Sequence, residues 1–243
     1  MDGGWEEAAG EHLAQGVARL RLPGWDATAG LVHGPAGALV VDAGARLREG
    51  AAIRRWARER TGGRVTHLAL THGHFDHVLG AAAFAGVSVY GAVGLDGLLA
   101  AGREELAADA VRHGADPAAT AEAADLLVRP HHLVSGEMTV DLGGDGVRRE
   151  AVLVNAGPGH TAHDLVVMVP GDPCVVFCGD LVEESGEPQA GPDAVPERWP
   201  AALDRLLGLG GGDARYVPGH GAVVDAAFVR AQRDQLAARF GVS

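Results

Sequence analysis

The chain has 243 residues, of which 47% are apolar, 21% charged and 5% aromatic. This composition excludes a disordered chain, a collagen and a coiled coil, and the length is sufficient to bury a full hydrophobic core. The 32 acidic residues outnumber the 20 basic ones, and the net charge of −12 disfavours nucleic acid and anionic membranes as partners because both are negative.

Short strands and helices are predicted along the first half of the chain. Alternating or continuous apolar residues between turn residues predict strands at Val17–Leu22, Thr28–His33, Gly37–Asp42, Val65–Leu70 and Val87–Tyr90. Helical spacing predicts a helix over Arg46–Arg60, which a Gly pair ends. A short helix of small residues is expected after the His-rich segment. One or two further helices are expected over residues 95–128, broken near Asp116 and Pro117.

The second half repeats this order. Strands are predicted at Met138–Leu142, Val147–Val154, Leu165–Val169, Val175–Phe177 and Arg215–Val217. Helices are predicted at Arg198–Leu209 and Ala226–Phe240, the first of them after a loop rich in Gly and Pro. Because no linker separates the halves, we expect a single domain over residues 1–243. Its class would be α/β (α+β), with two sheets packed face to face and helices outside.

The sequence argues against export, a membrane span, Lys-based catalysis and a disulfide framework. The N-terminal segment is acidic and lacks the apolar stretch of a signal peptide, so we expect a cytoplasmic protein. The uncharged stretch Val78–Leu95 is long enough to span a membrane, but its glycines predict a helix end, a turn and a strand instead. All basic residues are Arg, so no Lys can act as a nucleophile. Cys174 and Cys178 are too few for a disulfide framework.

The strongest signal in the sequence is Thr71-His-Gly-His-Phe-Asp-His77, which follows a predicted buried strand. His72, His74 and Asp76 occupy alternate positions, so their side chains can converge in a tight loop. Imidazole and carboxylate groups are the ligands expected for zinc and related metal ions. The motif therefore predicts a metal site at the end of this strand.

Three later segments place a His or an Asp on a sharp turn beside Gly, after a predicted strand. They are Asn155-Ala-Gly-Pro-Gly-His160, Phe177-Cys-Gly-Asp180 and Val217-Pro-Gly-His220. Glycine permits the close approach of the backbone that such turns need. Each segment alone is a weak signal, but together with the first motif they predict further ligands of the same metal centre.

These motifs, taken in order from Asp42 to His220, resemble those of the metallo-β-lactamase-fold superfamily of hydrolases. The resemblance implies an αββα sandwich of two mixed sheets, with the metal site at one edge. It implies that a first metal is held by His72, His74 and His160, a second by Asp76, His77 and His220, and that Asp180 bridges the two. Asp42 would support the site through hydrogen bonds without being a ligand.

The expected chemistry follows from this set of ligands. Two divalent cations carry four positive charges, and the carboxylates of Asp76 and Asp180 neutralise two of them. The centre therefore keeps a net positive charge and stays electrophilic. A water that bridges the metals would lose a proton near neutral pH and attack the substrate as hydroxide, with Asp76 and Asp180 as the catalytic carboxylates. We expect two zinc ions per chain, with iron or manganese as alternatives.

The substrate class can be narrowed by comparing the motifs of this sequence with those of known subfamilies. The motif set is similar to that of glyoxalase II-type enzymes and lactonases. True β-lactamases of the closest types lack an Asp at the position of Asp180 and are exported, and a signal-molecule lactonase typically has a Tyr shortly after that Asp. We therefore expect a hydrolase of a small ester, thioester or lactone. The alternatives are an iron-dependent oxygenase similar to persulfide dioxygenases, and a metal-binding or regulatory protein without turnover.

Selectivity is expected in loops around the site. Trp25, in the hairpin Pro23–Ala27, and Glu183, in the loop Glu183–Pro196, are the predicted substrate contacts, and the acidic loop would disfavour polyanionic substrates. The alternative location for selectivity is the Ala-rich helical segment Leu95–Val128. We expect a small-molecule substrate, no nucleic acid or membrane partner, and a monomer or homodimer. His163 and Cys178 could also approach the site, but a structural role is favoured for both.

Overall fold

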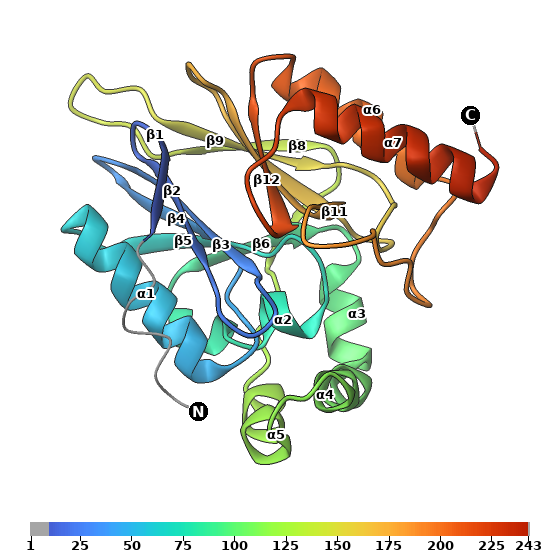
Figure 1. The fold of residues 1–243 in the computed structure, drawn as a ribbon. Coiled ribbons are helices and arrows are strands. Elements are labelled where there is room, and N and C mark those ends of the chain that lie inside the picture. Colours follow the sequence, from blue (N-terminus) through green and yellow to red (C-terminus); the bar gives the residue numbers. More distant parts are fainter. Residues whose placement is uncertain (1–9, 243) are drawn as a thin grey trace.

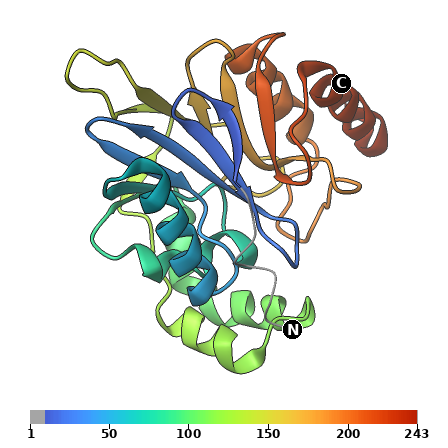
Figure 2. The same ribbon diagram turned by 60° about the vertical axis from the view of Figure 1, so that its left-hand side comes forward.

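Two β-sheets pack face to face, with helices on both outer faces (Figure 1). The computed structural model describes residues 10–242 of the chain. In Figure 2, the helices of the first half lie below one sheet and the C-terminal helices lie beyond the other. The expected αββα sandwich of the α/β (α+β) class is confirmed.

The first sheet contains seven strands in sequence order. They are β1 (Glu11–Ala14), β2 (Val17–Arg21), β3 (Thr28–Gly34), β4 (Gly37–Val41), β5 (Val65–Ala69), β6 (Ser88–Ala92) and β7 (His132–Val134). Strands β1 to β4 are antiparallel because short turns join them, and β4 to β7 are parallel because helical segments connect them. The sheet is therefore mixed, as predicted.

The second sheet contains five strands in the order β12-β11-β10-β9-β8. They are β8 (Glu137–Asp141), β9 (Glu150–Asn155), β10 (Leu165–Val169), β11 (Val175–Glu183) and β12 (Arg215–His220). Strands β8 to β11 form an antiparallel meander, and β12 pairs in parallel with β11 because a helix connects them.

Helices cover both outer faces of this sandwich. They are α1 (Leu47–Thr61), α2 (Phe75–Val78), the 3₁₀ helix η1 (Ala81–Phe84), α3 (Leu95–Ala101), α4 (Arg103–Arg112), α5 (Pro117–Asp125), α6 (Trp199–Gly210) and α7 (Ala226–Phe240). Helix α1 packs Ile53 and Ala57 against the first sheet, and α6 packs Leu203 and Leu206 against the second. None of the helices between residues 10 and 242 is long and apolar enough to cross a membrane.

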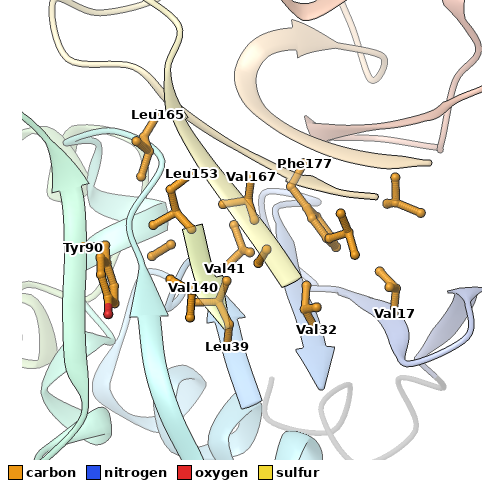
Figure 3. Packing of buried hydrophobic residues seen from close by; sticks show 14 of the residues in the cluster. Val17, Val32, Leu39, Val41, Tyr90, Val140, Leu153, Leu165, Val167 and Phe177 are labelled. Atoms are coloured by element: carbon orange, nitrogen blue, oxygen red, sulfur yellow. The ribbon is translucent and has the colours of Figure 1, made fainter. Parts of the chain in front are cut away.

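The main core lies between the two sheets (Figure 3). Successive residues of a strand point to opposite faces, so Val32 faces the inter-sheet core whereas Leu31 packs under α1. Gly30 is needed for this packing, because a Cβ at position 30 would lie 2.6 Å from the ring of Phe177 on the opposite sheet.

The predicted elements differ from the structure in a few places. Strands β1 and β7 were not predicted, because both are short and β1 exposes half of its residues at the sheet edge. The strand predicted from Val147 begins at Glu150, since Val147 closes a turn with Gly144. The strand predicted to end at Phe177 continues to Glu183. This last correction places two predicted site residues in a buried strand instead of a loop.

Candidate metal centre

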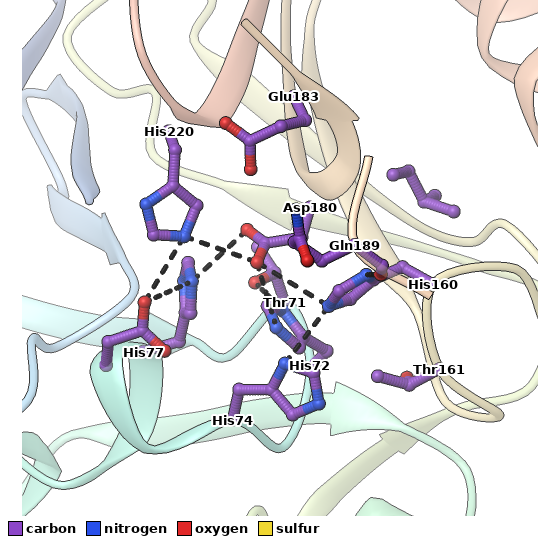
Figure 4. A network of polar contacts seen from close by, with 12 residues as sticks. Thr71, His72, His74, His77, His160, Thr161, Asp180, Glu183, Gln189 and His220 are labelled. Carbon is purple, nitrogen blue, oxygen red and sulfur yellow. Dashed lines mark hydrogen bonds and ion pairs between the residues drawn. The ribbon is translucent and has the colours of Figure 1, made fainter. Parts of the chain in front are cut away.

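The predicted ligands gather at one edge of the sandwich, where several strands end (Figure 4). His72, His74, Asp76 and His77 follow β5 in a tight loop that leads into α2. His160 lies in the turn between β9 and β10, and Asp180 lies within β11. His220 is the last residue of β12. All seven residues, which are up to 148 positions apart in the chain, are thereby brought together.

A first group of donor atoms comes from His72, His74, His160 and Asp180, and these atoms all lie within 4.8 Å of one another. The His160 Nε2 atom is 3.0 Å from His74 Nδ1 and 3.5 Å from Asp180 Oδ2. The His72 Nε2 atom is 3.6 Å from the same carboxylate oxygen. The three imidazoles therefore face one carboxylate.

A second group comprises Asp76, His77 and His220, again with donor atoms within 4.8 Å of one another. The His220 Nε2 atom lies 3.2 Å from Asp76 Oδ2 and 3.3 Å from Asp180 Oδ2. The His77 Nε2 atom lies 3.2 Å from Asp180 Oδ1. Asp180 therefore touches imidazoles of both groups and lies between them.

The chemistry of this cluster fits a metal. Three of its buried polar atoms, His72 Nε2, His77 Nε2 and Asp180 Oδ1, make no hydrogen bond among the described residues, although the last two lie 3.2 Å apart. Leaving a buried polar atom unpaired costs about 1–3 kcal/mol, so protein interiors rarely do so. Imidazole nitrogens and carboxylate oxygens that converge without partners are a donor set for a cation such as zinc. The protein is therefore metal-binding.

Asp42 orients the His-rich loop through hydrogen bonds to its carboxylate. It follows β4 with a positive φ of 61°, a conformation that points its carboxylate at the His-rich loop. One oxygen accepts a hydrogen bond from the Thr71 backbone N–H, at 2.8 Å. The other accepts from the Thr71 hydroxyl, at 2.8 Å, and from His77 Nδ1, at 2.9 Å. These bonds turn His77 Nε2 toward the second group.

Three other imidazoles are held through their outward-facing nitrogens. His220 Nδ1 lies 2.7 Å from the carbonyl oxygen of Trp25, and His160 Nδ1 lies 3.2 Å from that of Gln189. His74 Nε2 lies 3.0 Å from Asp193 Oδ2. Since carbonyl and carboxylate oxygens only accept, each ring donates outward and presents its other nitrogen to the cluster.

The two groups differ in proton affinity in the metal-free protein. Burial lowers the pKa of His160 to about 4 and lowers that of His72 well below its usual value. Burial also acts on His220, but Asp180 and Asp76 outweigh it and raise the pKa of His220 to about 12. His72 and His160 are therefore neutral, whereas burial of His74 is outweighed by its hydrogen bond to Asp193, which raises the pKa of His74. The second group holds protons that a cation would displace.

A cleft of about 800 Å³ opens beside both groups. The predicted substrate contacts Trp25 and Glu183 both line it. The Trp25 ring packs edge-on against Phe75, with ring centroids 5.3 Å apart. Glu183 differs from the expectation of a mobile acidic rim, because it ends β11, is buried and accepts a hydrogen bond from the Ser185 backbone. Its donor atom also lies within 4.8 Å of those of Asp180 and His220.

Helices α3 and α4 form another wall of the cleft. This wall belongs to the helical segment 95–128, the alternative location of selectivity, and it includes Leu98, Glu105 and Leu106. Neither of the two other residues considered from the sequence reaches the cleft. His163 packs over the turn at Gly94, and Cys178 is buried in the core beneath α6.

Two contributors were not predicted from the sequence. Asp193 is one of several acids in a loop rich in Gly and Pro, and no local pattern distinguishes it from the others. Gln189 contributes its backbone carbonyl, a group that every residue possesses. Their contacts with His74 and His160 depend on the fold of the loop over the site, which no local sequence pattern specifies.

A model of the metallo-beta-lactamase superfamily matches residues 22–220. Among solved structures, the chain is similar to the metallo-beta-lactamase FIM-1 from Pseudomonas aeruginosa in its mono-zinc form, with 20% identity, a TM-score of 0.70 and 96% of each chain covered. It is also similar to the DIM-1 metallo-beta-lactamase, with 18% identity, a TM-score of 0.71 and coverage of 96% of this chain and 98% of that one. A metallo-beta-lactamase from Hirschia baltica shows 17% identity, a TM-score of 0.68 and coverage of 94% and 97%. No curated protein sequence matches the chain.

Proposed function

The chain belongs to the metallo-beta-lactamase superfamily, and from this we propose that it is a hydrolase that holds two zinc ions and cleaves a small ester, thioester or lactone. The observation that carries the proposal is the position of the Asp180 carboxylate, which lies 3.2–3.6 Å from imidazole nitrogens of both groups. A carboxylate placed in this way can join two metal ions into one centre.

The ligand assignment follows the two groups of donors. We propose that His72, His74 and His160 hold one zinc ion, that Asp76, His77 and His220 hold the other, and that Asp180 contacts both. Seven nitrogen and oxygen donors exceed the four that a single tetrahedral zinc ion uses. This excess supports two ions over one.

Each group of residues in the site has a separate role in the proposed hydrolysis. When bound, the metals would supply a water of lowered pKa and would polarise the scissile carbonyl. Asp76 and Asp180 contribute only two negative charges against five neutral imidazoles, which keeps the centre electrophilic. Asp42 and the carbonyl of Trp25 hold two of the rings in their orientation, so little reorganisation accompanies the reaction. No Ser, Cys or Lys nucleophile is required.

The walls of the cleft indicate which substrates it accepts. Trp25, Phe75, Leu98 and Leu106 offer an apolar surface for an acyl or alkyl group. Acidic side chains also line the cleft, and its Arg112 is paired with acidic neighbours on α4. This balance favours neutral or cationic substrates with an apolar part and disfavours nucleotides and coenzyme A conjugates.

Two measurements test the proposal. Elemental analysis of protein prepared without chelator should find two zinc ions per chain, and a value that stays at one after zinc supplementation would contradict the dinuclear assignment. The zinc-loaded protein should then be assayed against p-nitrophenyl esters, thioesters, lactones and a chromogenic β-lactam. One iron per chain would favour the oxygenase alternative, and bound metal without turnover of any substrate would favour a regulatory protein.

A further inference from the structure

We propose that residues 184–196, in the loop between β11 and α6, are an integral part of the first metal group, so that metal binding there and closure of the loop over the cleft stabilise each other. The inference depends on the proposed function only in requiring a metal in the group formed by His72, His74, His160 and Asp180. Asp193 is its central positioning residue.

The first contact joins the loop to His74. The His74 Nδ1 atom faces the group, 3.0 Å from His160 Nε2, so the opposite nitrogen, Nε2, points away from it. That nitrogen lies 3.0 Å from Asp193 Oδ2. A carboxylate that accepts from the outer nitrogen of an imidazole fixes the ring orientation and raises its strength as a metal ligand. Asp193 therefore acts on the metal through His74.

The second contact joins the loop to His160. The Gln189 carbonyl oxygen lies 3.2 Å from His160 Nδ1, which leaves Nε2 free to face the group. The backbone N–H of Val195 also donates to the carbonyl of Gly159, at 2.9 Å, beside this same His. The loop therefore holds two of the three imidazoles of the first group in place.

The other imidazoles do not depend on the loop in this way. His72 and His77 are held by Thr71 and Asp42, which follow adjacent strands of the first sheet. His220 is held by the carbonyl of Trp25. Loss of the Asp193 contact should therefore weaken the first metal group and leave the second intact.

The same loop forms one wall of the substrate cleft, through residues that include Gln189, Pro192 and Asp193. Its start is tied to the turn at His220, because Glu184 accepts a hydrogen bond from Ala222 at 2.6 Å. By thermodynamic linkage, a metal that needs the closed loop must favour closure to the same extent that closure favours the metal. Occupancy of the first group thus sets the shape of the cleft.

The test compares three variants in the full chain. Asp193→Ala removes the acceptor, Asp193→Asn keeps an oxygen that can accept but loses the charge, and Glu187→Gln is the control in the same loop. Zinc affinity at each group is measured by competition with a chromophoric chelator. Hydrogen exchange of residues 184–196 is followed with and without zinc.

We expect Asp193→Ala to lower the affinity for one of the two zinc ions by about 10- to 100-fold and to leave the affinity for the other unchanged. Asp193→Asn should show a smaller loss, and the Glu187→Gln control none. Zinc should slow exchange in the loop of the wild type and do so less in Asp193→Ala. The inference would be overturned if Asp193→Ala left the zinc affinity unchanged or lowered the affinity for both ions equally. It would also be overturned if zinc did not change the hydrogen-exchange rate of the loop. A wild type that binds two zinc ions without hydrolysing any substrate would refute the proposed hydrolase alone, and one that binds no zinc would overturn both.

Discussion

Gly219, which is not a ligand, should control the metal centre through its lack of a side chain. It lies in β12, directly before His220 and beside Asp180. A Cβ at position 219 would lie 1.8 Å from Asp180 Oδ1 and 2.9 Å from the Gly179 carbonyl carbon. The substitution Gly219→Ala therefore tests whether the Asp180 carboxylate must occupy its observed position.

The size of the perturbation follows from these distances. Carbon and oxygen atoms in contact are about 3.3 Å apart or more, so Asp180 Oδ1 would have to move by about 1.5 Å. Metal–ligand distances tolerate deviations of only about 0.2 Å. The carboxylate is buried among imidazoles of both groups and has little room to compensate. Since displacing a residue behind a ligand already costs 10- to 100-fold in metal affinity, displacing the shared ligand should cost more than about 100-fold.

Chelator competition and elemental analysis measure this loss, and urea denaturation of the metal-free protein shows whether the fold survives. The matched control is Gly208→Ala in α6, where an added Cβ would meet nothing within 4 Å among residues 10–242. This control should keep its metal and gain up to about 1 kcal/mol in the free energy of unfolding, because Ala favours a helix more than Gly does. A folded Gly219→Ala protein with wild-type metal affinity would refute the role assigned to Asp180.

Three further predictions concern the site and the fold. Asp180→Ala should abolish turnover without unfolding the protein. The His163 ring packs outside the cleft, so His163→Ala should retain most of kcat/KM. Equal losses of kcat/KM in the two variants would contradict the ligand assignment. Trp25→Ala combined with Glu183→Gln should reorder kcat/KM across a substrate panel at constant zinc content, and an unchanged ranking would move selectivity to the α3–α4 wall. Burial raises the pKa of Glu49 from 4.5 to about 7, so between these pH values the folded protein binds a proton that the unfolded chain lacks. Relative to Glu49→Gln, the wild-type free energy of unfolding should fall as the pH rises through this window, by up to roughly 3 kcal/mol, as urea titrations of both proteins at several pH values would show.

Local patterns in the sequence were sufficient for most of the fold. The alternation in Val17–Leu22 and the apolar run in Gly37–Asp42 are properties of neighbouring residues, and both segments form strands of the first sheet. The helix predicted over Arg46–Arg60 is present within one residue at each end. The metal-binding character was also visible, because four of the seven predicted ligands lie within the six residues from His72 to His77.

Other features were decided only by the tertiary structure. The continuation of β11 to Glu183 depends on its pairing with β12, which contributes partners from more than 30 positions away. The same pairing buries Glu183, which its acidic neighbours in the sequence suggested would be exposed. The hydrogen bond between His74 and Asp193 joins residues 119 positions apart, and Gln189 acts through its backbone. Local periodicity reports the preference of a segment for helix or strand, but the partners of an imidazole depend on which distant segments pack beside it, and that is determined only when the two sheets and their loops come together.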